Sequence, residues 1–234
     1  MALPNQGRAA LSVPEIETEN QVKLVKTLLN QGSNPNTQNC VMHPNELCSP
    51  LAFAAKTSCM EIAKALLKAG ADVNQTTEKC KQSPLVLATE GGHTDMVRLL
   101  LESGADVNLC DADGNCPLVF AATGGWHYLG SKACGYPEIA EQLLEYGANS
   151  LLKNNEGKSA VTYAIEKGSP SVMKSMLSRR IDWKMAALKE GVSLVQHFKV
   201  EWTRIKEKFL FQEFAREALA ILKEDFAKWK IGTR

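Results

Sequence analysis

Residues 83–108 read SPLVLATEGGHTDMVRLLLESGADVN, and this stretch decides the fold. Ser83 can cap a helix whose first turn accepts Pro84, because the proline ring presets φ and its missing N–H would have no helical partner there. The glycine pair at 91–92 ends this helix, and a second apolar stripe at helical spacing then runs to Gly104. The stretch therefore predicts two short helices joined by a tight turn.

The chain repeats this unit. The interval from Pro50 to Pro84 is 34 residues, that from Pro84 to Pro117 is 33, and the sequence GADVN at 70–74 recurs at 104–108. A period of this size is typical of a stacked array, in which one unit cannot bury its apolar faces without its neighbours.

The repeated unit resembles the ankyrin repeat family. The resemblance rests on the Ser-Pro-Leu start, the spacing from Ala88 to Gly92 and His93, the leucine-rich second helix and the GADVN end. It implies an all-α solenoid of helix-turn-helix units with short hairpin loops. It also implies a protein-binding function rather than catalysis.

The period and its interruptions divide the chain into three parts. Residues 1–13 predict a flexible N-terminal arm, and residues 14–182 hold about five repeats, the first of them shortened. About ten extra residues, 127–136, interrupt the fourth repeat and predict a protruding loop. Residues 183–234 predict a degenerate helical pair and a long amphipathic C-terminal helix.

Two local departures from the repeat are visible. Ser58 stands where a glycine is expected between the helices of the second repeat. The connection from the second to the third repeat is one residue longer than usual, and the one before the second repeat is five residues longer.

Two apolar positions recur in the first helices, followed by a recurring alanine. We expect both to pack in the core between repeats, since large apolar side chains are mostly buried, and the alanine to allow close helix contact. The first row is Leu51, Leu85, Leu118 and Val161; the second is Phe53, Leu87, Phe120 and Tyr163; the alanines are Ala54, Ala88, Ala121 and Ala164.

Composition excludes several function classes. The net charge is +1 with both signs interspersed, which argues against a nucleic-acid surface. No apolar run is long enough to span a bilayer, and the start lacks the pattern of a secretory signal. Seven scattered cysteines favour free thiols in a reducing compartment, so we expect a cytoplasmic or nuclear protein without a membrane partner.

The family resemblance implies that the partner, another protein, lies against a concave face of hairpin tips and first helices. Two aromatic residues beside the insertion are candidate anchors, although packing of the inserted loop onto the stack explains Trp126 equally well. The expected partner-binding residues are Glu46, Lys56, Lys79, Lys81, Gln82, Glu90, Asp113, Asn115, Thr123, Trp126, Tyr128, Glu156, Lys158, Glu166 and Lys167.

No motif predicts an enzyme, a cofactor or a small-molecule substrate. No nucleophile motif lies beside any of the four histidines. The sequence DADGN at 111–115 superficially resembles a calcium loop but lacks the later glutamate, so a hairpin turn is favoured. A zinc site is conceivable at Cys40, His43, Cys48 and Cys80, but the spacing is loose and ordinary loop thiols are the favoured interpretation.

Asn74 and Asn108 each follow Asp-Val and lie eight residues after a leucine. This resembles the context in which eukaryotic ankyrin asparagines are hydroxylated by a 2-oxoglutarate-dependent enzyme. The two residues would then be modification sites, not catalytic ones.

Two versions of the binding function remain open. In one, the chain is a stand-alone adaptor whose tail helix folds back onto the last repeat. In the other, it is the regulatory N-terminal ankyrin domain of a larger enzyme, receptor or channel, and the tail leads to the missing domain.

Overall fold

The computed structural model describes residues 19–38, 40–42, 46–124, 135–167, 169, 171–172 and 175–176. Within these residues the chain forms eight helices and one small hairpin. The helices are α1 (Glu19–Asn30), α2 (Pro50–Thr57), α3 (Met60–Lys68), α4 (Pro84–Glu90), α5 (Thr94–Glu102), α6 (Pro117–Thr123), α7 (Pro137–Glu145) and α8 (Ala160–Lys167); the strands are β1 (Cys40–Met42) and β2 (Glu46–Cys48).

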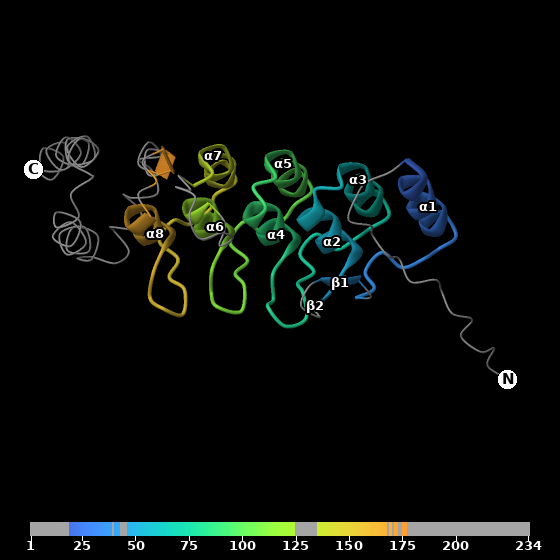
Figure 1. Ribbon diagram of the computed structural model, residues 1–234, viewed down its shortest axis with the longest axis horizontal. Coiled ribbons are helices and arrows are strands. Elements are labelled where there is room, and N and C mark those ends of the chain that lie inside the picture. The colour runs from blue at the N-terminus through green and yellow to red at the C-terminus, as the bar shows by residue number, and fades with distance from the viewer. Residues whose placement is uncertain are drawn as a thin grey trace, which may run out of the picture.

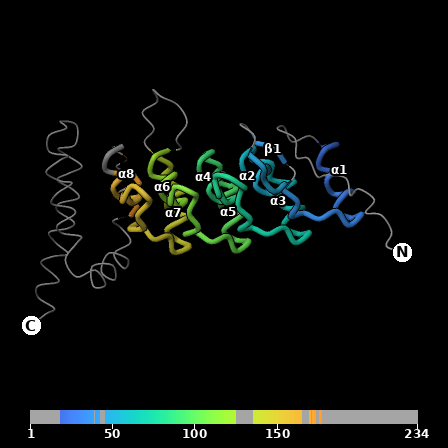
Figure 2. Tube along the Cα trace, turned by 90° about the horizontal axis from the view of Figure 1, so that it is seen from below, coloured from blue at the N-terminus to red at the C-terminus, as the bar shows by residue number. Residues whose placement is uncertain are grey.

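The helices lie in two parallel rows (Figure 1). One row contains α2, α4, α6 and α8, each in contact with the next, and the other contains α1, α3, α5 and α7. Within a repeat, α2 packs on α3, α4 on α5, and α6 on α7. The view from below shows the repeats following one another in the same order along the array (Figure 2). The prediction of a mostly helical repeat fold is confirmed for this part of the chain.

Capping follows the sequence pattern. The Oγ atom of Ser49 accepts a hydrogen bond from the N–H of Ala52, and that of Ser83 accepts one from Val86, both at 3.2 Å. Each serine precedes a proline in the first turn of its helix, α2 or α4. These bonds satisfy amides that a helix start otherwise leaves unpaired, so the start of each first helix is defined locally.

Ser58 ends α2 in the left-handed backbone conformation, with φ of +59°. Gly92, the corresponding residue of the third repeat, has φ of +70°. The serine therefore adopts the conformation of the glycine it replaces, in which a Cβ atom is strained.

The core lies between the two rows. The first apolar row predicted from the sequence is fully buried, and so are the four recurring alanines. In the second row Leu87, Phe120 and Tyr163 are buried, whereas Phe53 is only partly buried. The predicted core is therefore confirmed, with Phe53 at its edge.

The repeats are connected by loops that we call fingers, which lie along one edge of the molecule (Figure 1). We number each finger by the repeat into which it leads. The described residues place β1 and β2 in the second finger, followed by the third at 77–82, the fourth at 111–115 and the fifth at 154–158. At each junction one backbone N–H of the later finger donates to a carbonyl of the earlier one. The pairs are Glu78 to Leu47, Ala112 to Cys80 and Asn155 to Asp113, at 2.9–3.0 Å.

A second row of bonds joins the repeats away from the fingertips. The side-chain Oδ1 of Asn36 accepts from the N–H of Asp72, that of Asn74 from Asp106, and that of Asn108 from Asn149. We call this set of three the asparagine row. It explains why an asparagine recurs at the same position of successive repeats.

Several sequence predictions fall outside the described residues. These are the N-terminal arm at 1–13, most of the insertion at 127–136, and the C-terminal segment 183–234. The shortened first repeat is represented by α1, which packs on α3 in the second-helix row. In the part of the chain that the structure describes, no helix is both long and apolar enough to cross a membrane.

Candidate functional site

The fingers and the row of first helices together form one face, which we call the finger face. It contains a hollow of about 380 Å³ that spans the third, fourth and fifth repeats. The third, fourth and fifth fingers contribute its sides, and α4, α6 and α8 contribute its base. The hollow is lined by Gln82, Glu90, Asp111, Asp113, Asn115, Phe120, Asn154, Asn155, Glu156 and Tyr163.

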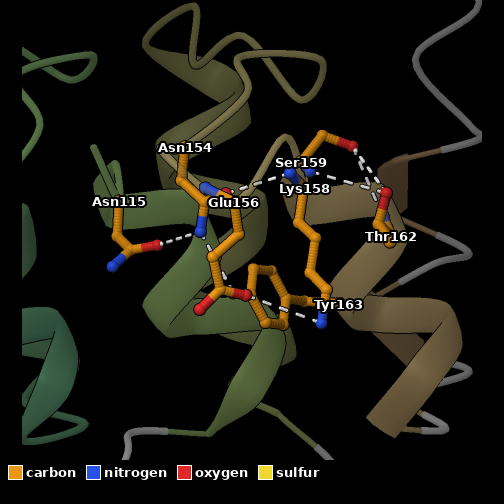
Figure 3. Close-up of polar contacts among 7 residues, drawn as sticks. All are labelled: Asn115, Asn154, Glu156, Lys158, Ser159, Thr162 and Tyr163. Atoms are coloured by element: carbon orange, nitrogen blue, oxygen red, sulfur yellow. Dashed lines mark hydrogen bonds and ion pairs between the residues drawn. The ribbon is translucent and has the colours of Figure 1, made fainter. Parts of the chain in front are cut away.

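Asn154 is the centre of the polar contacts at one end of this hollow (Figure 3). Its Nδ2 donates to Asn115 Oδ1 at 2.8 Å and to the Tyr163 hydroxyl oxygen at 3.0 Å. Its Oδ1 accepts from the backbone N–H groups of Glu156 and Lys158. One buried amide therefore holds together the fourth finger, the fifth finger and α8, with both of its polar atoms paired.

Lys158, Glu156 and Tyr163 form a charged group beside Asn154 (Figure 3). The lysine Nζ lies 3.7 Å from Glu156 Oε2 and 5.3 Å from the centre of the Tyr163 ring. The tyrosine hydroxyl also donates to Glu156 Oε2 at 3.5 Å. The lysine cation is therefore attracted both by the face of the Tyr163 ring and by the Glu156 carboxylate.

The fourth and fifth fingers use the same turn chemistry. Asp111 Oδ1 accepts from the N–H groups of Asp113 and Asn115, as Asn154 does from the corresponding residues of the next finger. Partial burial raises the pKa of Asp111, against the opposing effect of its hydrogen bonds with Asn115. The turn interpretation of DADGN is thereby supported, since this carboxylate is used to order the finger.

The structure distributes the predicted partner-binding residues over three environments. Lys56, Lys79, Lys81, Asp113 and Glu156 are exposed, and Gln82, Glu90 and Lys158 are half-buried. Glu46, Asn115 and Thr123 are buried. Trp126, Tyr128 and the side chains of Glu166 and Lys167 lie outside the described residues.

Glu46 stabilises the fold of the fingers. Its side chain is 6% exposed, and its Oε1 accepts from the backbone N–H groups of Lys79 and Cys80 at 2.8 and 2.9 Å. Burial raises the pKa of this carboxyl, but the bonds from Cys80, Thr77 and Lys79 outweigh it, so the pKa lies below its usual range. Thr123 is likewise turned inward, its hydroxyl donating to the carbonyl of Val119.

Five residues that line the hollow were not among the predicted binding residues: Asp111, Asn154, Asn155 and, both assigned to the core, Phe120 and Tyr163. A signal was present in the sequence, because Asp111 and Asn154 occupy the same place in successive fingers. Tyr163 also brings a hydroxyl to a row that is otherwise apolar. Phe120 was expected in the core, and it is buried there while one side of it lines the hollow.

The cysteines considered as zinc ligands do not converge in the described residues. Cys40 and Cys48 are buried partners across the β1–β2 hairpin, whereas Cys80 is exposed on the next finger. A hydrogen bond with Cys40, together with burial, raises the pKa of the Cys48 thiol. Among the residues described, no three His, Cys, Asp or Glu side chains are grouped to hold a metal ion, and His43 lies outside them.

The two asparagines expected to be modified belong to the asparagine row. Asn74 Oδ1 and Asn108 Oδ1 each accept a backbone N–H of the next repeat at 2.8 Å, and Asn108 Nδ2 also donates to Gly147. A modifying enzyme would have to reach side chains that are engaged between repeats.

Comparison with known families bears on the identity of this array. Residues 51–129 match the family model for ankyrin repeats, in three copies. Within residues 51–129 the chain carries ankyrin repeats. No curated protein matches the sequence. Ankyrin repeats are in general protein-interaction modules and are typically non-catalytic, so the finger face of these ankyrin repeats is the candidate binding surface.

Proposed function

We propose that the chain is a non-catalytic protein-interaction module that binds a partner protein along the finger face. The observation that carries this proposal is the hollow at the third to fifth repeats, where side chains from three fingers and three first helices converge. A concave site lined by a few placed polar groups is the usual form of a recognition site.

The pattern of burial supports the same surface. On α5 and α7, which lie in the opposite row, the exposed residues include Asp95, Glu102 and Glu138. On the finger face, charged residues of both signs are exposed, among them Lys79, Lys81 and Asp113, whereas Gln82 and Glu90 are half-buried. A polar rim around a partly enclosed centre is typical of protein-binding surfaces.

The test compares three forms of the intact chain in affinity capture from an extract of the source cells. The first is unchanged, the second carries Glu90→Ala, Asp113→Ala and Glu156→Ala, and the third carries Asp95→Ala, Glu102→Ala and Glu138→Ala. The two variants lose the same charge, one on the finger face and the other on the opposite row of helices. We expect quantitative mass spectrometry to show partners lost from the second form and kept by the third.

Equal capture by the first and second forms would contradict the proposal. Thermal unfolding of all three forms, followed by circular dichroism, checks that the comparison is made between folded proteins.

A further inference from the structure

The hollow on the finger face carries negative charge. Its lining includes the carboxylates of Glu90 on α4, Asp111 and Asp113 on the fourth finger, and Glu156 on the fifth. Of the described residues that line it, none is a lysine, arginine or histidine. Lys158, on the fifth finger, meets Glu156 at one end, so the negative charge of the lining exceeds the positive charge beside it.

The base of the hollow is aromatic. Phe120 from α6 and Tyr163 from α8 both line it, and both are almost fully buried beneath the polar rim. Carboxylates above such a base are suited to a cation with an apolar stem, because the stem contacts the small part of each aromatic residue that faces the hollow while the charged end reaches the acids.

We propose that this hollow receives an arginine or lysine side chain of the partner protein. The inference rests on the proposed function and specifies the chemistry of the partner at this site. The chain itself provides a precedent, since Lys158 lies over the Tyr163 ring and against Glu156 at 5.3 and 3.7 Å. A partner's cation would be held by the carboxylates of Glu90 and Asp113, which line the same hollow.

A metal ion fits these residues less well than an organic cation. The Asp111 carboxylate accepts backbone amides of its own finger, with Oδ1 3.0 Å from Asp113 N and 2.7 Å from Asn115 N. Within the described residues, no three Asp, Glu, His or Cys side chains are grouped closely enough to hold a metal ion. The acids are spread around a hollow of about 380 Å³, which suits a side chain better than a single ion.

The experiment uses the intact chain and a phage-displayed library of random dodecapeptides. Peptides selected on the unchanged chain are synthesised, each with its basic residue kept or replaced by citrulline for arginine or norleucine for lysine. Their Kd is measured by fluorescence anisotropy against the unchanged chain, against Glu90→Gln with Asp113→Asn, and against Asp95→Asn with Glu102→Gln as the matched control.

We expect the selected peptides to share an arginine or lysine. Neutralising either that residue or the Glu90 and Asp113 pair should raise Kd about tenfold, and the control pair should leave it unchanged. Selected peptides without a common basic residue, or with unchanged Kd on the Glu90→Gln, Asp113→Asn form, would overturn the inference.

The same peptides separate this inference from the proposed function. In one outcome, peptides bind the Glu90→Gln, Asp113→Asn form as well as the unchanged chain but fail to bind the form with alanine at positions 90, 113 and 156. That result would show that the finger face binds peptides without needing the charges of Glu90 and Asp113. The inference would then fail and the proposed function would stand. Peptides retained by both forms would contradict both, as would a selection that yields no binder.

Discussion

At the scale of single residues, Ser58 and Lys81 adopt the left-handed backbone conformation that favours glycine. Their φ angles are +59° and +54°. Gly114 and Gly157 stand at the place in the following fingers that Lys81 takes in its own, and both also have positive φ. The longer third finger is thus built with the same turn, at a cost in strain that the other fingers avoid.

Replacing Ser58 by glycine should therefore stabilise the protein. Relief of the left-handed strain contributes about 1 kcal/mol, partly offset by the greater freedom of glycine in the unfolded chain, for a net gain of about 0.5 kcal/mol. Urea unfolding measures the change. The matched substitution Gly114→Ala should do the opposite, because its Cβ would lie 3.1 Å from the backbone of Asn154 at a φ of +78°. A Ser58→Gly protein no more stable than the original would contradict this account.

Asn154 is the side chain whose loss should most disturb the hollow. Asn154→Ala removes bonds to Asn115, Tyr163 and the turn of its own finger, leaving buried partners unpaired at a cost of about 2 kcal/mol. Asn155→Ala is the control, because Asn155 is exposed and its side chain donates one hydrogen bond to the Ala112 carbonyl, at 3.1 Å. Equal destabilisation by the two substitutions, measured by thermal unfolding, would argue against a central role for Asn154.

At the scale of the elements, Glu46 ties the β1–β2 finger to the third finger. Because its pKa is lowered on folding, its stabilising effect is present above the pKa of the unfolded chain and is lost as the pH falls through the folded value. Between about pH 6 and about pH 3 the protein should therefore lose more stability than the Glu46→Gln variant does. Urea midpoints at both pH values give the comparison.

A glutamine at this position keeps an acceptor oxygen, so the variant should remain folded and cost only about 1 kcal/mol near neutral pH. An identical pH dependence in the two proteins would show that other carboxyl groups account for the acid sensitivity.

At this scale, the helices were predictable from the sequence alone, whereas the hollow was not. Proline spacing, serine caps and the glycine-terminated second helices are local signals, so the helices of the described repeats were predictable. Gln82, Glu90, Asp113, Asn115 and Glu156 were all assigned to one face, and all line the hollow. Sequence could not show that the hollow exists, because its depth depends on how Asn154 and Tyr163 pack across two repeats. Nor did it show that Glu46 turns inward, which depends on amides of the next finger.

At the scale of the whole molecule, each repeat contacts chiefly its neighbours, so position in the array should govern the effect of a core substitution. Leu100→Ala, in the central helix α5, leaves a cavity at a fully buried site and should cost about 3 kcal/mol. Leu28→Ala, in the end helix α1, removes a partly buried side chain and should cost about 1 kcal/mol.

The rates of amide hydrogen exchange should also distinguish the Leu28→Ala variant from the Leu100→Ala variant. Leu28→Ala should speed exchange in α1 while α4 to α6 stay protected, whereas Leu100→Ala should lower protection across the central repeats. Uniform loss of protection in both variants would show that the described repeats unfold as one unit.

The fingertip bonds and the asparagine row together join the second repeat to the third, and the third to the fourth, at two separate places. A single attachment would act as a hinge, whereas two fix the angle between one repeat and the next. A partner therefore meets a surface that is already in its bound shape, and association requires little loss of conformational entropy. Partners of different affinity should then differ mainly in how slowly they dissociate, since their association depends on diffusion and charge rather than on rearrangement of this chain.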